Sequence, residues 1–339
     1  MTELASDEIL RVDRLQTHFE LGTRVAKSVD GVSFSVRRGQ TVAVVGESGS
    51  GKSVTSLSVM GLLSRPGRII GGKILYRTRS EHVVDLASLP QRTLRAMRGR
   101  EIAMIFQEPM TSLNPLYTVG QQIDEMIKLH EPLGSADRRA RVKQMLDLVE
   151  IPDAARRIDE YPHQMSGGMR QRVMIALALS CNPSLLIADE PTTALDVTIQ
   201  AQILDLLRRL QGELGMSILF ITHNLGVVAE IAHDVVVMYA GRVVEQAPVD
   251  TLFAHPKHPY TQGLLACMPD ARRHRTESGV PLALQPIPGT VPNVTDLPDG
   301  CSFSPRCRFA QPNCAVNPGP DLLVSGPNRF SRCWYHETL

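Results

Sequence analysis

The stretch that decides the fold runs Thr41-Val42-Ala43-Val44-Val45-Gly46-Glu47-Ser48-Gly49-Ser50-Gly51-Lys52-Ser53. Its first five residues are apolar or β-branched, which predicts a buried parallel strand. The remainder fits the G-x-x-x-x-G-K-S pattern of a phosphate-binding loop, and residues 53–60 continue as a helix whose N-terminus faces an anion. A chance match is the alternative, and the flanking strand and helix argue against it. We therefore expect a nucleotide site here.

The loop residues have distinct expected roles. Glycines let the chain turn sharply and bring backbone N–H groups towards phosphate oxygens. Lys52 can reach the β- and γ-phosphates, and the Ser53 hydroxyl can bind Mg²⁺. The nucleotide contacts expected from this loop are those of Gly46, Ser48, Gly49, Ser50, Gly51, Lys52 and Ser53.

A second apolar run, residues 185–189, ends in two carboxylates. Asp189 stands at the strand end, and its oxygens suit Mg²⁺. Glu190 follows, and a second carboxylate there can orient and activate a water for in-line attack. The alternative is that Asp189 and Glu190 form a solvated turn before Pro191. The presence of a phosphate loop in the same chain makes this the weaker explanation.

Two more apolar runs, 102–106 and 217–222, are followed by Gln107 and His223. An amide at the first position could touch both metal and water. A histidine at the carboxyl end of a parallel strand lies where such sheets bind ligands. Surface side chains are the alternative for each residue alone. The expected catalytic residues are Glu190, His223 and Gln107, and the expected magnesium ligands are Ser53, Gln107 and Asp189.

Together these motifs resemble the ATP-binding subunit of an ABC transporter, over roughly residues 7–265. The matches are Walker A at 46–53, the Q-loop at Gln107, the signature at Ser166-Gly167-Gly168-Met169-Arg170-Gln171, Walker B at 185–190, the D-loop at Ala194-Leu195-Asp196 and the switch histidine at His223. The resemblance implies an α/β fold. Its parts are a RecA-like P-loop ABC ATPase core, an N-terminal antiparallel β region and an inserted helical subdomain at about 92–182.

The resemblance also implies a head-to-tail dimer. ATP held by one subunit's Walker A is capped by the other subunit's signature, here Ser166, Gly167 and Gly168, with Asp196 from the D-loop. A glycine-containing helix N-terminus suits that anion. Phe19 stands where the family has an aromatic residue that stacks on adenine.

Local patterns complete the core. Residues 8–45 read as strands, 197–214 as a helix with one apolar face, and 235–245 as a closing hairpin. Lys and Arg number 36 against 35 Asp and Glu, which gives no electrostatic case for a nucleic-acid partner. No apolar run approaches the about 18 residues of a membrane span, and the acidic N-terminus lacks a signal peptide's apolar stretch. We expect a cytosolic protein, or one held at the membrane by partners.

The composition shifts after residue 255. Residues 256–339 contain 13 of the 23 prolines, which disfavours long helices and central strands. The expected division is an ABC nucleotide-binding domain at 1–255 and a small, loop-rich, cysteine-containing C-terminal extension at 256–339.

Four of the six cysteines lie in this extension, namely Cys301, Cys307, Cys314 and Cys333. Clustered cysteines in a cytosolic chain point to metal rather than to disulfides. Their spacing fits neither common zinc sites nor ferredoxins, so it leaves zinc and iron–sulfur open. His336 is an alternative ligand.

The extension resembles that of ATPases from bacterial dipeptide and oligopeptide importers. The matching stretches are His258-Pro259-Tyr260-Thr261, Pro288-Gly289-Thr290-Val291-Pro292 and Gly300-Cys301-Ser302-Phe303-Ser304-Pro305-Arg306-Cys307, with Phe106-Gln107-Glu108-Pro109-Met110-Thr111-Ser112-Leu113-Asn114-Pro115 in the core. The resemblance implies ATP and Mg²⁺ as cofactors and a 4Fe-4S cluster on the four cysteines. It implies as partners a second ATPase (a paralogue or a copy), two permease subunits and an external binding protein, with this chain at the cytoplasmic face of the membrane.

Other functions stay open at this point. The same subgroup includes importers of nickel complexes, glutathione and sugars. A soluble ABC protein of DNA repair or translation is disfavoured, because the long coiled-coil insertions and the second cassette are missing. A metal-sensing or structural protein with a vestigial nucleotide site conflicts with the intact catalytic set.

Overall fold

The computed structural model describes residues 4–107, 112–193, 195–268 and 286–339. The sheet at the N-terminus is antiparallel, in the order β2-β1-β4-β5. Its strands are β1 (Glu8–Leu21), β2 (Arg24–Arg37), β4 (Gly67–Arg77) and β5 (Val83–Asp85). Buried and partly exposed residues alternate along much of β1 and β2, so one face of this sheet packs on the core.

The larger sheet has the order β11-β12-β10-β9-β3-β8-β7-β6. Its strands are β3 (Thr41–Val45), β6 (Ile102–Ile105), β7 (Leu185–Asp189), β8 (Ser217–Thr222), β9 (Asp234–Tyr239), β10 (Arg242–Pro248), β11 (Leu323–Gly326) and β12 (Arg329–Ser331). The five strands from β9 to β6 are parallel, and β10, β12 and β11 continue the sheet antiparallel. Strands β3, β7 and β8 are buried along their whole length, as expected for a sheet covered on both faces.

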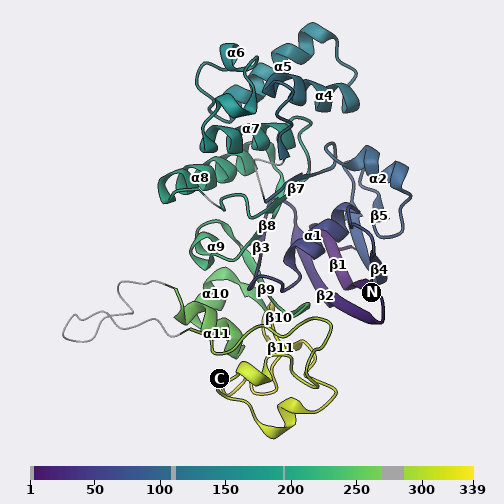
Figure 1. Cartoon of the computed structure of the whole chain (residues 1–339), viewed down its shortest axis with the longest axis vertical. Helices are drawn as coiled ribbons and strands as arrows, with labels where there is room; N and C mark the ends of the chain where they lie inside the picture. The colour runs from purple at the N-terminus through teal and green to yellow at the C-terminus, as the bar shows by residue number, and fades with distance from the viewer. Residues whose placement is uncertain (1–3, 108–111, 194, 269–285) are drawn as a thin grey trace, which may run out of the picture.

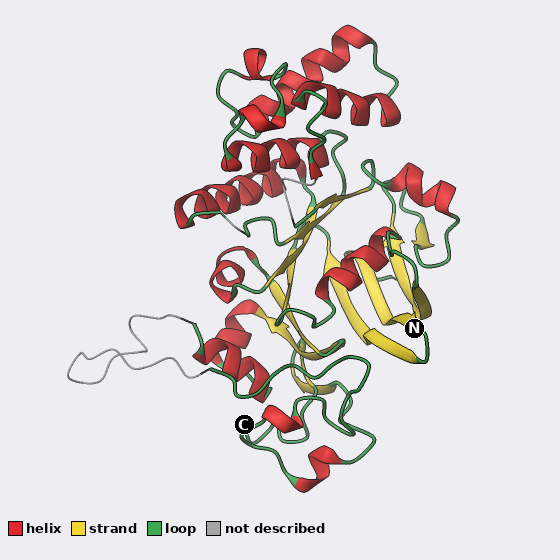
Figure 2. Ribbon diagram, in the orientation of Figure 1, coloured by secondary structure: helices red, strands yellow, loops and turns green. Residues whose placement is uncertain are grey.

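Helices cover this sheet and extend beyond one end of it (Figure 1). They are α1 (Lys52–Met60), α2 (Gln91–Met97), α4 (Val119–His130), α5 (Ser135–Leu148), α6 (Ala154–Arg157), α7 (Gly167–Leu179), α8 (Val197–Leu214), α9 (Leu225–Ile231), α10 (Val249–Ala254) and α11 (Pro259–Ala266), with 3-10 turns η1 (Pro162–Gln164), η2 (Ser304–Arg306) and η3 (Pro312–Ala315). Figure 2 shows α4 to α7 grouped at one end of the molecule and the loop-rich extension at the other.

Three apolar clusters hold these parts together. One joins the helical group to β6, β7, β8 and α8, and a second lies between the two sheets around α1. The third joins β3, β9 and β10 to α11 and to Phe303 of the extension. The extension therefore shares a core with the ATPase sheet.

The α/β architecture with an N-terminal antiparallel sheet matches the predicted fold class. The strands at 8–45, the hairpin β9–β10 and the helix at 197–214 form as expected. The range 92–182 is not entirely helical, because β6 pairs with β7 inside the larger sheet. Within the described residues, no helix is long and apolar enough to cross a membrane.

Candidate functional site

The phosphate loop connects β3 to α1, and two of its positions require glycine. Gly46 has φ +152°, and a Cβ there would lie 2.2 Å from the Met238 carbonyl oxygen. Gly51 has φ +101°, and a Cβ there would lie 2.3 Å from the Ser28 carbonyl oxygen. Side chains at either position would collide with main chain, so the loop packs against β2 and β9 only because both residues are glycine.

Lys52 begins α1 and is 6% exposed. Its Nζ donates to the carbonyl oxygens of Gly46 (2.7 Å) and Glu47 (3.0 Å). Burial lowers the pKa of Lys52, and the charges of Glu190 and Asp189 oppose that change. The ammonium group is thus held over the loop, where phosphate oxygens would lie.

Asp189 and Ser53 meet at the end of β7. The Ser53 hydroxyl donates to Asp189 Oδ1 at 3.1 Å, and the Ser56 hydroxyl donates to Oδ2 at 3.4 Å. Burial raises the pKa of the Asp189 carboxyl, and the Ser53 hydrogen bond opposes that rise. A buried carboxylate beside a hydroxyl is an oxygen donor set that fits Mg²⁺.

Glu190 lies at the centre of a hydrogen-bonded group. Its Oε2 accepts from Thr193 Oγ1 (2.9 Å) and Gln107 Nε2 (3.1 Å), and its Oε1 lies 3.1 Å from His223 Nδ1. Burial would raise the pKa of Glu190, but the bonds to His223 and Thr193 outweigh it and leave that pKa lowered. Glu190 is therefore an ionised carboxylate that three neighbouring side chains hold in place.

The register of the sheet explains why these side chains meet. Parallel pairing sets Val45 of β3 beside Thr222 of β8, and Asp189 of β7 beside Ile221. Each motif follows the carboxyl end of its strand, and neighbouring parallel strands end at the same edge of the sheet.

The signature residues begin α7, and Asp196 caps α8. The Ser166 hydroxyl accepts from the Met169 N–H (3.3 Å), and the Asp196 carboxylate accepts from the Ile199 N–H (2.9 Å). A Cβ on Gly168 would stand 3.0 Å from the Ile199 side chain, so the two helix starts are neighbours. Both capping side chains are exposed, which leaves this surface open to another molecule.

Phe19 is half-buried on β1, with its ring against Gly67 of β4. The neighbouring Thr17 lies 2.8 Å, oxygen to oxygen, from Ser58 of α1. Strand β1 is therefore fixed against the helix that follows the phosphate loop.

Residues 108–111 and Ala194, which belong to the motifs quoted above, lie outside the described residues.

The four cysteines of the extension surround one cavity. Cys301, Cys307, Cys314 and Cys333 all line it, together with Phe303, Phe309 and Tyr335. Burial raises the pKa of the Cys301, Cys307 and Cys333 thiols, that of Cys333 to about 11. Within the part of the chain that the structure describes, no three His, Cys, Asp or Glu side chains converge closely enough to hold a single metal ion. His336 instead bonds through Nδ1 to the Cys333 carbonyl oxygen (2.8 Å).

Two residues of the extension touch the phosphate loop, which the motifs gave no reason to expect. Tyr260 accepts a hydrogen bond from the Glu47 N–H, and Arg306 donates to the Glu47 carboxylate. The partners lie 213 and 259 residues apart along the chain. A tyrosine and an arginine carry no local signal that could have identified these contacts.

Two family models match the chain. Residues 29–193 match the ABC transporter model, and residues 244–314 match the model of the oligopeptide/dipeptide transporter C-terminal region. The first range contains the phosphate loop, the signature and both carboxylates at the end of β7. The second contains Tyr260, Arg306 and three of the four clustered cysteines.

Two curated relatives match this chain over nearly its whole length. A Brucella ovis protein named "Putative peptide import ATP-binding protein" is 53% identical over 334 residues, which cover 97% of this chain and 98% of the relative. The dipeptide transport ATP-binding protein DppD of Escherichia coli K12 is 49% identical over 328 residues, 96% of each chain.

Solved structures agree on the core. The dimeric ATP-binding cassette MJ0796, bound to ADP and Pi, superposes with a TM-score of 0.63 at 25% identity and covers 71% of this chain and 99% of that chain. CbiO1 of Clostridium perfringens, part of an ABC transporter complex, gives a TM-score of 0.61 at 29% identity and covers 74% of this chain and 92% of that chain. With its loop, carboxylates and extension in place, this chain belongs to the ABC transporter ATPases, in the group that carries the oligopeptide/dipeptide transporter C-terminal region.

Proposed function

We propose that this chain hydrolyses ATP to power the import of di- or oligopeptides through a membrane ABC transporter. The observation that carries the proposal is near full-length similarity, extension included, to a dipeptide transport ATP-binding protein. Import of nickel complexes, glutathione or sugars is the alternative within the same group, because the ATPase itself does not contact the cargo.

For ATP hydrolysis we propose that Glu190 is the general base. Its ionised carboxylate faces the same sheet edge as the phosphate loop, and His223 and Gln107 hold it in orientation. Ser53, Asp189 and Gln107 would hold Mg²⁺, which when bound neutralises charge on the phosphates. Lys52 and the backbone N–H groups of residues 46–51 would bind the phosphates, and the half-buried Phe19 ring would stack on adenine.

The second half of each ATP site would come from another ATPase subunit. Ser166, Gly167 and Gly168 stand at an exposed helix N-terminus, where a γ-phosphate of a partner-bound ATP could be capped. Asp196 begins the adjacent helix and would lie in the same interface. The similarity to a dimeric cassette supports this arrangement. Whether the partner is a copy or a paralogue depends on the partner's own sequence.

A permease contact is supported by an apolar cleft beside the Q-loop. The cleft has a volume of about 340 Å³, and its walls come from β6, α4 and α7. Phe106 is 42% exposed and Leu129 69% exposed, so two large apolar side chains of the cleft are open to solvent. We propose that a short permease helix occupies the cleft. Two permease subunits and an external binding protein would complete the assembly, with this chain at the cytoplasmic face of the membrane.

For the extension we propose a 4Fe-4S cluster held by Cys301, Cys307, Cys314 and Cys333. A single tetrahedral zinc would need its four sulfurs about 4 Å apart, since Zn–S bonds are about 2.3 Å. A cluster gives each thiolate its own iron, so its ligands stand further apart around one cavity. Burial raises the pKa of the Cys301, Cys307 and Cys333 thiols, and the backbone N–H group two residues after each cysteine opposes that rise by bonding to the sulfur, as hydrogen bonds to cluster ligands do.

The cargo is tested by purifying the chain with its membrane partners and reconstituting the assembly in liposomes. The proposal expects ATP-dependent uptake of a labelled dipeptide with the binding protein present. Uptake of nickel, glutathione or sugar instead would replace the peptide assignment. Co-purification with ribosomes or DNA, and without a permease, would refute transport altogether.

The cluster is tested separately by iron, acid-labile sulfide and the visible spectrum of anaerobically purified protein. We expect about four irons and four sulfides per chain. Cys301→Ser should remove them, whereas Cys267→Ser, a thiol at the end of α11, should keep them. Zinc in place of iron, or no metal, would refute the cluster without affecting the transport proposal.

A further inference from the structure

An arginine of the cysteine-containing extension is bonded to the phosphate loop. Arg306 Nη1 donates to Glu47 Oε2 at 2.7 Å, and Nη2 donates to Oε1 at 3.0 Å. The Arg306 side chain is 5% exposed and that of Glu47 is 31% exposed. A bidentate pair with so little solvent around the guanidinium fixes the relative orientation of the two side chains and is screened less than an exposed ion pair.

Glu47 is held at its carboxylate, its N–H and its carbonyl oxygen, and residues of the extension hold the first two of these groups. Its carboxylate accepts from Arg306, and its N–H donates to Tyr260 Oη at 2.8 Å. Its carbonyl oxygen accepts from Lys52 Nζ at 3.0 Å. The residue that the extension holds is therefore one of the two, with Gly46, whose carbonyl oxygens hold the Lys52 ammonium group.

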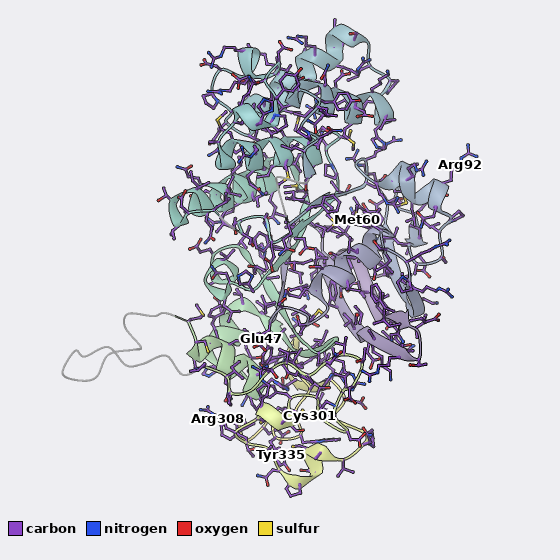
Figure 3. The ribbon with its side chains drawn as sticks, in the orientation of Figure 1. Glu47, Met60, Arg92, Cys301, Arg308 and Tyr335 are labelled. Carbon is purple, nitrogen blue, oxygen red and sulfur yellow. The ribbon has the colours of Figure 1, made fainter. Side chains whose placement is uncertain are left out.

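Arg306 is itself rigidly held. Its Nε donates to the Pro288 carbonyl oxygen at 2.8 Å, and its Nη1 lies 3.4 Å from Tyr239 Oη. It ends the turn η2, and Phe303 just before that turn packs edge-on against Tyr239 with ring centroids 5.2 Å apart. Figure 3 labels Glu47 just above the extension, in which Cys301 and Arg308 are labelled. The guanidinium is thus presented to the loop by a packed aromatic cluster.

We propose that Arg306 is a positioning residue for ATP binding. It acts through Glu47, whose main chain it keeps in the geometry that directs loop N–H groups and Lys52 at the phosphates. The proposal rests on the ATP-binding function of the loop. It requires neither the iron–sulfur cluster nor a peptide cargo, so those assignments can fail while this one holds.

The test compares Arg306→Ala, Arg306→Lys and Arg308→Ala in the full chain by steady-state ATPase kinetics and equilibrium ATP binding. Arg308 is a matched control, because it is two residues away, is exposed and stacks on Phe309. We expect Arg306→Ala to raise the KM and Kd for ATP about tenfold with little change in kcat, the pattern of lost uniform binding. Arg306→Lys should recover part of this loss, since lysine keeps the charge but not the two-point geometry.

Glu47→Gln keeps the main chain of the loop and lies outside the extension, so it cannot unfold the cysteine region directly. It should raise the KM for ATP as Arg306→Ala does, and the double variant should be no worse than the poorer single variant. An unchanged KM and Kd in Arg306→Ala, with only a lower melting temperature, would show a scaffolding role and overturn the proposal. A loss of kcat at constant KM, or full additivity in the double variant, would also overturn it.

Discussion

Replacement of Glu190 by glutamine tests the proposed chemistry most directly. The carboxylate accepts from Thr193 and Gln107 on Oε2 and faces His223 on Oε1. An amide oxygen at the Oε2 position would still accept both bonds. An amide nitrogen at the Oε1 position could donate to His223 Nδ1 in the tautomer that is protonated on Nε2. The geometry of the group should therefore survive, and only the charge and basicity are lost.

The expected loss of turnover follows, because only the contribution of the general base is removed. General-base catalysis contributes about 10²–10⁴-fold, which corresponds to about 3–5 kcal/mol of activation free energy. Because Lys52 and the loop glycines are unchanged, the affinity for ATP should stay within a few-fold of the parent. The assay is phosphate release at saturating Mg-ATP, combined with equilibrium ATP binding on the same preparation.

The matched control is Glu213→Gln on α8, where an exposed carboxylate pairs with Arg209. It should leave turnover unchanged. Turnover of the Glu190→Gln variant within about threefold of the parent would refute the role of general base. A fall in turnover that is matched by an equal fall in ATP affinity would show that the residue supports binding instead.

Three further outcomes are expected. Burial and Arg332 lower the pKa of His258 to about 3, so its neutral form stabilises the fold fully above pH 6.5 and that stability is lost as the pH falls. The free energy of unfolding from melting curves should therefore fall by up to about 1.4 kcal/mol per pH unit below pH 6. This dependence on pH should weaken in His258→Asn but not in His255→Asn. Asp189→Asn should raise the Mg²⁺ concentration that half-saturates turnover at least tenfold; an unchanged Mg²⁺ dependence would remove Asp189 from the metal site. Met145→Ala, in the fully buried core of the helical group, should cost about 2–5 kcal/mol in denaturant unfolding; a cost below 1 kcal/mol would contradict the packing.

The convergence of Gln107, Asp189, Glu190 and His223 could be predicted from the sequence. Each follows a short run of apolar residues, and buried parallel strands are the elements that such runs form most readily. Once the strands are parallel neighbours, their carboxyl ends share an edge. The order of the strands could not be predicted from the runs themselves, and the structure supplies it.

The outer part of the sheet could not be predicted. Residues 323–326 and 329–331 form β11 and β12, but neither segment is long enough to show a period of two. Their pairing depends on the free edge of β10, about 80 residues earlier, rather than on their own sequence. High proline content correctly indicated a loop-rich extension and gave no sign that it would join the sheet.

The contacts of Arg306 could not be predicted from the sequence for a different reason. Charged side chains are common at surfaces, and a pair 259 residues apart is one among many possible pairs.

The cysteines are an intermediate case. Their clustering in sequence predicted a shared site, and they do line one cavity, but spacing does not determine whether sulfurs reach bonding distance from a metal.

The pairing of β12 with β10 has a consequence for the chain while it is being made. Strand β10 ends at Pro248, and β12 begins 81 residues later at Arg329. At 5–20 residues per second, a ribosome needs roughly 4–16 s to synthesise that interval. Throughout it, the backbone N–H and C=O groups on one side of β10 have no covering strand, and such an edge is a template for intermolecular pairing. We therefore expect nascent chains of this protein to expose an unpaired edge of β10 late in translation, until β12 pairs with it.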